Sequence, residues 1–136
     1  MAEQFRVQSY APRGVAIWVR ETALMINEVL RRGSTINDLI TAGTTQTQAG
    51  GTVLGMGFNR VTTANANDGV KFPLPGSGDE VIIRNDSGAA IQIWPQSSGK
   101  VDDGSADAVD GNTLADNKSR TYRATDSTNW YTVGNS

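Results

Sequence analysis

The chain has 136 residues, neither cysteine nor histidine, and a formal net charge of −2 at pH 7. Without cysteine it can form no disulfide, thiolate zinc site or cysteine nucleophile, and without histidine it lacks the commonest general base and metal ligand. This composition argues against an enzyme and predicts no resident metal or cofactor. The length suits one domain with an extended terminus.

The charge is distributed unevenly along the chain. Residues 1–60 hold six arginines and four acids, whereas residues 61–136 hold six basic and ten acidic side chains. This division indicates an attachment segment on an exposed, acidic body, and it lacks the dense basic patch of a nucleic-acid binder. No apolar run approaches the roughly 20 residues of a membrane span, and the first residues lack the pattern of a secretory signal. We therefore expect synthesis in the cytoplasm and neither a nucleic-acid nor a membrane partner.

The N-terminal part predicts an arm and then one helix. Residues 1–16 read as an extended arm, because Pro12 disfavours helix before it and Gly14 loosens the backbone after it. Residues 17–32 have helical periodicity, with a stripe formed by Trp18, Thr22, Met25 and Val29. Gly33 suits the C-terminal cap. The helix could pack on its own domain or dock on a partner subunit.

The next segment is polar and poorly periodic. Residues 34–43 have room for one more helical turn, with Thr35 and Asp38 at weak capping-box spacing. Residues 44–51 read as a linker or an edge segment. We therefore predict that residues 1–50 form an arm, helix and linker used for anchoring and oligomerisation, and that residues 51–136 form a β domain.

Short strand patterns of period two recur through the predicted β domain. They cover residues 54–58, 70–72, 81–84, 91–94, 120–124 and 130–133, the last two joined by the polar segment 125–129. Residues 85–88, Asn-Asp-Ser-Gly, separate two of them and predict a β-hairpin. The expected fold is mainly β: a small antiparallel β-sandwich or barrel-like domain with an N-terminal arm and one short α-helix. Because no strict sequence repeat is present, a solenoid is not predicted.

Two groups of side chains are candidates for a site. Asp102, Asp103, Asp107 and Asp110 lie on a glycine-containing loop that could hold Ca²⁺ or simply be solvated, although the spacing is not that of an EF-hand. Paired carboxylates could also serve glycoside hydrolysis, but no sugar cleft is indicated. Trp94, Trp130 and Tyr131 could stack on a sugar, fill an interface or belong to the core.

Several motifs in the β domain together resemble a module of tailed-bacteriophage virion proteins. In chain order they are N-R-V-T-T at 59–63, D-G-V-K-F-P at 68–73, V-I-I-R-N-D-S-G at 81–88, I-Q-I-W-P at 91–95, S-G-K-V-D-D at 98–103 and N-W-Y at 129–131. The resemblance covers residues 51–133. It implies a compact β structure, often trimeric, found in head decoration (cement) proteins and in tail and fibre components.

The resemblance implies a structural role in the virion. We expect a homotrimeric capsid decoration protein that binds the major capsid protein on the outer capsid surface and stabilises the shell. The arm and helix would then supply anchoring contacts to the capsid or to another copy. The candidate residues are Phe5, Arg6, Tyr10, Arg13, Ile17, Trp18, Met25 and Val29. The alternative is a tail or fibre component that binds host surface glycan through Trp94, Trp130 and Tyr131.

Overall fold

The computed structural model describes residues 36–136. The predicted arm, the predicted helix and all eight anchoring candidates lie outside the described residues. Within 36–136 there are nine strands and no helix: β1 (Ile36–Thr41), β2 (Thr52–Val53), β3 (Gly57–Thr63), β4 (Gly69–Lys71), β5 (Glu80–Asn85), β6 (Gln92–Trp94), β7 (Lys100–Val101), β8 (Lys118–Ala124) and β9 (Asn129–Asn135). The prediction of a mainly β fold is confirmed.

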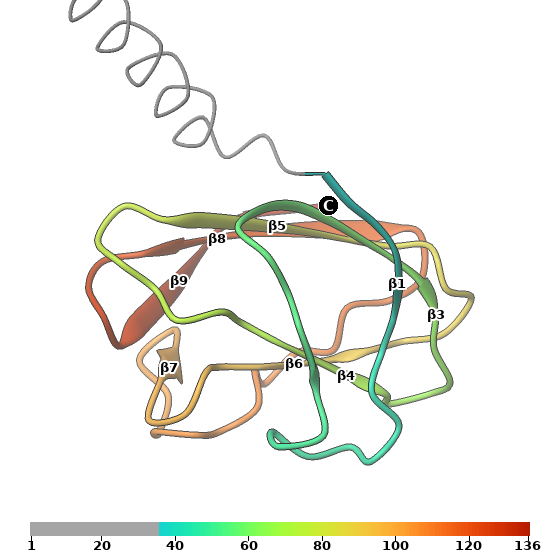
Figure 1. The fold of residues 1–136 in the computed structure, drawn as a ribbon, viewed down its shortest axis with the longest axis horizontal. Helices are drawn as coiled ribbons and strands as arrows, with labels where there is room; N and C mark the ends of the chain where they lie inside the picture. Colours follow the sequence, from blue (N-terminus) through green and yellow to red (C-terminus); the bar gives the residue numbers. More distant parts are fainter. Residues whose placement is uncertain (1–35) are drawn as a thin grey trace, which may run out of the picture. The chain divides into compact units, whose positions relative to one another are not determined.

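The strands form two sheets that alternate along the chain. One sheet has the order β1-β3-β5-β8-β9-β7, and the other has the order β2-β4-β6 (Figure 1). Strands β1, β3 and β5 pair in parallel, as do β2, β4 and β6. The chain therefore winds through three turns, each with one strand in each sheet, as in a β-solenoid. The expected antiparallel arrangement was wrong for these strands, which pair in parallel.

The predicted hairpin across residues 85–88 is also wrong. Strand β5 pairs with β3 and β8, while β6 pairs with β4, so the turn carries the chain from one sheet to the other. The buried Asn85 side chain fixes this crossing: its amide donates to the carbonyls of Ala89 and Leu114 at 2.7 and 2.8 Å, and its oxygen accepts from Ser87. These polar residues form a turn that carries the chain from one sheet to the other, and not a tight hairpin turn.

Strand β1 replaces the helical turn predicted over residues 34–43. It pairs in parallel with β3, with Ile36 opposite Phe58, and its register shifts twice. Leu39 lies at one of these irregularities with a φ of 59°, and its N–H bonds to the Asp38 carboxylate at 2.8 Å. The prediction failed because the capping-box spacing is weak evidence, and because pairing with β3 supplies backbone hydrogen bonds that a single helical turn cannot.

The two ends of the stacked turns differ. At one end β8 pairs antiparallel with β5 and then with β9, so a hairpin covers the third turn. This pair of closing strands was expected from the sequence and is confirmed. At the other end, β1 and β2 pair with no strand of residues 36–136 other than those of the second turn. The view in Figure 1 looks along the stack, with the first turn in front.

A single core lies between the two sheets. It contains Phe72, which comes directly after β4, together with Tyr122 of β8 and Trp130 of β9. The Phe72 ring centroid is 4.6 Å from that of Trp130, in a stacked arrangement, and 4.7 Å from that of Tyr122, edge to face. The Trp130 indole N–H donates to the Gln96 side-chain oxygen at 3.0 Å. Aliphatic side chains at period-two positions fill the rest: Val61, Val70, Val81, Ile83, Ile91, Ile93 and Leu114.

A buried polar cluster ties the acidic loop to β8. The Arg120 guanidinium lies 3.2 Å from the Asp110 carboxylate, and the Tyr122 hydroxyl donates to the same carboxylate at 2.5 Å. Arg120 also donates to the carbonyls of Asn112 and Thr113. Burial first, and then the adjacent carboxylate, raises the pKa of Tyr122 above its ordinary value. The phenol therefore stays protonated and remains a donor to Asp110.

Candidate interaction surface

A row with three apolar side chains, continued by a threonine and a glycine, crosses the outer face of the six-stranded sheet, the face turned away from the core. Its members face one another in the strand register: Ile36 (β1), Phe58 (β3), Ile82 (β5), Thr121 (β8) and Gly134 (β9). We call these five residues the outer row. Val81 and Ile83 on either side of Ile82 are fully buried, so Ile82 points outward. Ile36 is 71% exposed, while the side chains of Phe58 and Ile82 are half-buried.

A chain of ion pairs borders the outer row on one side. Arg60 contacts Asp38 and Asp86, both at 2.9 Å, and Arg84 contacts Asp86 at 2.6 Å. Hydrogen bonds from the Arg60 guanidinium lower the pKa of both carboxylates below the ordinary Asp value. Each of these charged side chains forms an ion pair within the chain. This margin of the row is therefore polar, and its charges need no partner from another molecule.

The other margin is also polar. Arg123 pairs with Glu80 across β8 and β5 at 3.0 Å, and the Tyr131 hydroxyl donates to Asp103 at 2.7 Å. An apolar centre with a polar margin is the composition of many protein–protein interfaces. The outer row is therefore the candidate interaction surface of the β unit.

Two exposed carboxylates have lowered pKa values because they accept hydrogen bonds, and these shifts predict how the stability of the fold varies with pH. The pKa is lowered in Asp126 by the Asn129 side chain and two backbone N–H groups, and in Asp107 by Gln48 and Ser98. A pKa that is lower in the folded state contributes stability above the unfolded value of about 3.9, and this contribution is lost as the pH falls through the folded value. We expect denaturant unfolding to give a constant free energy of unfolding down to about pH 5 and a fall below about pH 4.

The variant Asp126→Asn checks this explanation at one site. It removes the titrating carboxylate but leaves an oxygen that can accept a hydrogen bond, so the acid loss of stability should become shallower. Ser127→Ala, in the same exposed turn, should lose stability with falling pH as the wild type does. An Asp126→Asn protein that loses stability with acid as steeply as the wild type would contradict the assignment.

The four aspartates of the acidic loop do not form one site. Each carboxylate accepts hydrogen bonds from different groups: Asp102 from Thr132, Asp103 from Tyr131, Asp107 from Gln48 and Ser98, and Asp110 from Arg120 and Tyr122. In residues 36–136 no three acidic side chains are placed to share a metal ion. These carboxylates shape the loop and attach it to neighbouring segments, and each is held separately rather than paired with another for acid–base chemistry.

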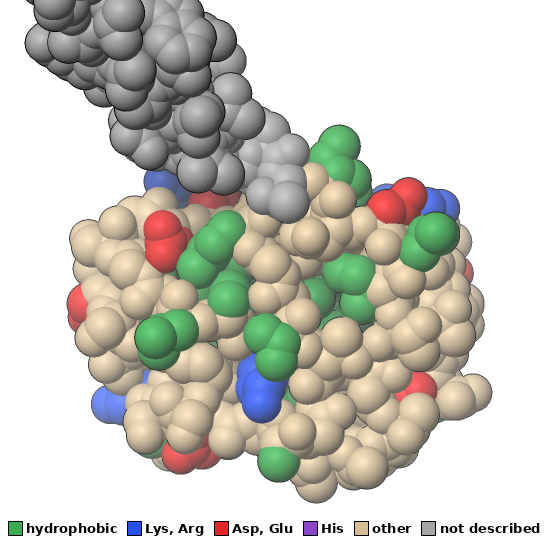
Figure 2. Space-filling model, viewed as in Figure 1, with side chains coloured by type: hydrophobic (Ala, Val, Ile, Leu, Met, Phe, Trp, Pro, Cys, Tyr) green, Lys and Arg blue, Asp and Glu red, His purple; other side chains and the backbone are tan. Residues whose placement is uncertain are grey.

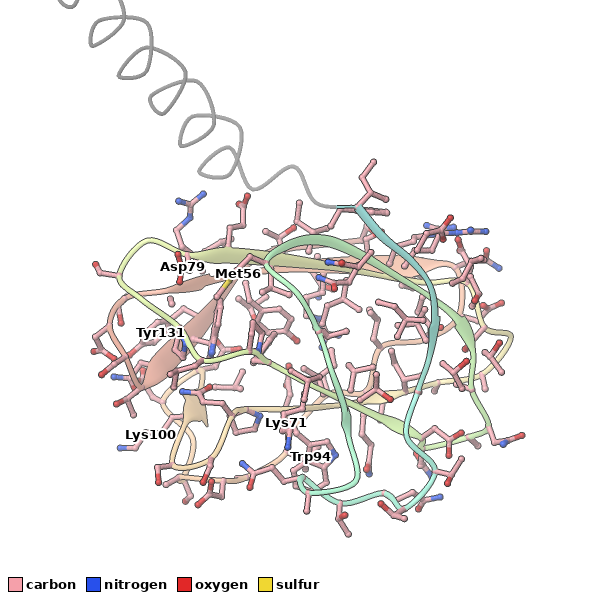
Figure 3. All side chains as sticks on the ribbon, viewed as in Figure 1. Met56, Lys71, Asp79, Trp94, Lys100 and Tyr131 are labelled. Atoms are coloured by element: carbon pink, nitrogen blue, oxygen red, sulfur yellow. The ribbon has the colours of Figure 1, made fainter. Side chains whose placement is uncertain are left out.

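The three candidate aromatic residues do not form one platform. Trp130 is fully buried in the core, so a role in contacting sugar is excluded for it. Trp94 lies beside Lys71 in the small sheet, whereas Tyr131 lies at the left-hand end of β9 (Figure 3). The Trp94 indole N–H is buried without a hydrogen-bond partner in the described structure, and it packs over Gly69, where an added Cβ would lie 3.0 Å from it. Of the three, Trp94 remains a candidate for binding.

The sequence prediction missed the outer row. The period-two pattern predicted over residues 54–58 places Phe58 on the same strand face as Leu54 and Met56, but Gly57 has a φ of 82° and the alternation changes there. Phe58 faces outward, and Asn59 after it is buried and exchanges hydrogen bonds with the backbone of Gly55. One signal was available: the run Val81-Ile82-Ile83 places an apolar residue on each face of β5.

No family model matches the chain, and neither a curated protein nor a solved structure shows significant similarity to it. The part of the chain that the structure describes contains no helix able to span a membrane.

Proposed function

We propose that this protein is a structural component of a phage virion, a homotrimeric capsid decoration protein that binds the major capsid protein on the outer capsid surface. The outer row carries the proposal, because it offers an apolar docking surface with satisfied polar margins. The order of the phage-like motifs in residues 59–131 supports it independently. The two facing sheets support a β-sandwich description of the unit.

A decoration protein needs binding rather than chemistry. Among the described residues, the aspartates of the acidic loop are held by protein donors, and the chain has no histidine or cysteine to act as base or nucleophile. Apolar surface of the outer row that becomes buried against a shell subunit would stabilise the complex by about 25 cal/mol per Å². These features fit a role in holding capsid subunits together.

The second candidate is a tail or fibre component that binds host glycan. The half-buried Trp94, whose strand register places it opposite Lys71, favours it, because a partly exposed aromatic ring can stack on a sugar. The two candidates differ in how many copies a virion carries.

The deciding experiment is quantitative mass spectrometry of purified virions against the major capsid protein. A copy number comparable to that of the capsid protein supports decoration. A few copies per virion would move the protein to the tail or a vertex and favour the glycan candidate. Complete absence from the virion would overturn both.

The outer row makes a sharper prediction for capsid binding. Ile82→Glu places a carboxylate at the centre of the row, and burying it without a partner should lower capsid affinity by at least about tenfold, which corresponds to about 1.4 kcal/mol. Binding to shells lacking the protein can be measured by co-sedimentation. The control is Ser97→Glu, an exposed position outside the row, which should bind as the wild type. Equal binding by both variants, with circular dichroism showing both folded, would rule out the row as the capsid contact.

A further inference from the structure

Three aspartates in the chain are directly followed by glycine: Asp68, Asp103 and Asp110. At such a pair the backbone can rearrange without an enzyme, because glycine has no Cβ to shield its nitrogen from the carboxyl group of the aspartate before it. Exposure alone does not select a reactive aspartate, since acidic side chains are scattered over the face of the molecule drawn in Figure 2. The contacts of each Asp–Gly pair therefore decide which of the three reacts in the folded protein.

The Asp68–Gly69 pair is held by the small sheet. Asp68 is buried, and its carboxylate accepts a hydrogen bond from the Asn65 N–H at 2.7 Å. Gly69 is the first residue of β4 and exchanges backbone hydrogen bonds with Gly43, both at 2.8 Å. For its nitrogen to reach the Asp68 carboxyl carbon, the start of β4 would have to leave these contacts, an opening that disturbs the packed sheet. The fold therefore protects this pair.

The Asp110–Gly111 pair is held by its carboxylate. Asp110 is buried, and its oxygens accept hydrogen bonds from Arg120, Tyr122 and the Asn112 N–H. The rearrangement removes one of these oxygens as water, so the contacts with Arg120 and Tyr122 would have to break first. Breaking a buried ion pair is costly. This pair is therefore protected as well.

The Asp103–Gly104 pair is exposed, in the turn that follows β7. The Asp103 carboxylate accepts a hydrogen bond from the Tyr131 hydroxyl at 2.7 Å, at the surface. The Gly104 N–H closes the turn on the Val101 carbonyl at 2.8 Å and takes no part in strand pairing. Both hydrogen bonds can open while the two sheets stay paired, and such local openings cost far less free energy than unfolding.

We infer that Asp103 is the Asp–Gly site at which the folded protein isomerises to isoaspartate. The Gly104 nitrogen attacks the side-chain carboxyl carbon of Asp103. A C–N bond forms, the nitrogen loses its proton, and a carboxyl oxygen leaves as water. Water then opens the resulting succinimide ring at either carbonyl. Opening at the α-carbonyl frees the α-carboxylate and leaves the main chain running through the side-chain carboxyl carbon, so the backbone is longer by one carbon and the composition is unchanged.

The longer backbone should disturb the turn between Val101 and Gly104. The neighbouring Asp102 holds the Thr132 N–H of β9 at 2.8 Å, so the change should reach the edge of the large sheet. We expect the Thr132 amide to exchange its hydrogen faster in the isomerised protein than in fresh protein. The free α-carboxylate also makes the aged protein a substrate for enzymes that methylate isoaspartyl residues.

The test is incubation of the purified full-length protein at neutral pH in water enriched in heavy oxygen. Each passage through the succinimide adds a heavy oxygen, and peptide mapping by mass spectrometry with electron-transfer fragmentation locates both the label and the isoaspartate. In the folded protein Asp103 should react at least about tenfold faster than Asp68 and Asp110. In urea the three should react at similar rates. Equal rates in the folded protein, no reaction at Asp103, or the same ranking in urea would overturn the inference.

Two variants check the attack by the Gly104 nitrogen. Asp103→Asn forms the same ring with ammonia as the leaving group, so it should accumulate isoaspartate at this position faster than the wild type. Asp103→Glu keeps a carboxylate for the Tyr131 hydroxyl but would need a larger ring, so it should accumulate no such product there. Circular dichroism checks that both variants are folded. A folded Asp103→Asn protein that stays unconverted would show that the nitrogen does not reach the side chain, and would also overturn the inference.

Discussion

Arg120→Met should lower the free energy of unfolding by about 3–5 kcal/mol, the cost of breaking a buried ion pair by removing one partner. Arg120 and Asp110 are both buried. The guanidinium pairs with Asp110 and donates hydrogen bonds to the Tyr122 hydroxyl and to the carbonyls of Asn112 and Thr113. Without it the Asp110 carboxylate keeps the Tyr122 hydroxyl as a donor but loses its counter-charge. The loss is measured by urea unfolding at pH 7.

Arg123→Met is the matched control on the same strand. Arg123 is half-exposed, with 53% of its side chain accessible, and pairs with Glu80 in solvent, so its loss should cost less than about 1 kcal/mol. Adding Asp110→Asn to Arg120→Met should recover part of the lost stability, because the buried charge is then removed. Equal destabilisation by the two arginine variants would show that the Arg120 cluster does not stabilise the fold.

Trp130→Ala should be about as severe, with an expected loss of about 3–5 kcal/mol. The side chain is fully buried, stacks on Phe72 and donates to Gln96, so its removal leaves both a cavity between the two sheets and an unpaired amide oxygen. The loss is measured by thermal and urea unfolding. Trp130→Phe should cost clearly less, because most of the ring contact with Phe72 is retained.

The neighbouring Tyr131 provides the control. It is half-buried on the opposite face of β9, and its hydroxyl bonds to Asp103 on the exposed loop, so Tyr131→Ala should cost no more than about 1–1.5 kcal/mol. A Trp130→Ala protein no less stable than Tyr131→Ala would contradict the description of Trp130 as a core residue.

The sequence predicted which face of a strand is buried far better than it predicted strand neighbours. Val70 and Phe72, Val81 and Ile83, and Ile91 and Ile93 are buried as their alternation indicated. Alternation of period two identifies a face but carries no information about which strand lies alongside. For that reason β5 and β6, adjacent in the chain and separated by good turn residues, were wrongly paired with each other.

The candidate site was less predictable than the fold. The outer row depends on a register that aligns Ile36, Phe58 and Ile82 from three separate turns, and no local pattern specifies that register. The acidic loop likewise suggested a shared ion site, because its aspartates are close together in the sequence. Sequence spacing does not show that the Asp102 carboxylate accepts hydrogen bonds from Thr132, or that Asp110 is buried against Arg120. Both outcomes depend on contacts between residues far apart in the chain.

The position of the covering hairpin has a consequence during synthesis. Strand β5 begins the third turn, and the edge that β3 leaves free is covered by β8, which comes after β6, β7 and the whole acidic loop. A nascent chain emerging from the ribosome therefore exposes the hydrogen-bonding edge of β5 and the core face of Ile83 until residues 118–124 have been made. Chains ending before that strand would lack Tyr122 and Trp130 as well, and ribosome-released fragments of this length are expected to aggregate rather than fold.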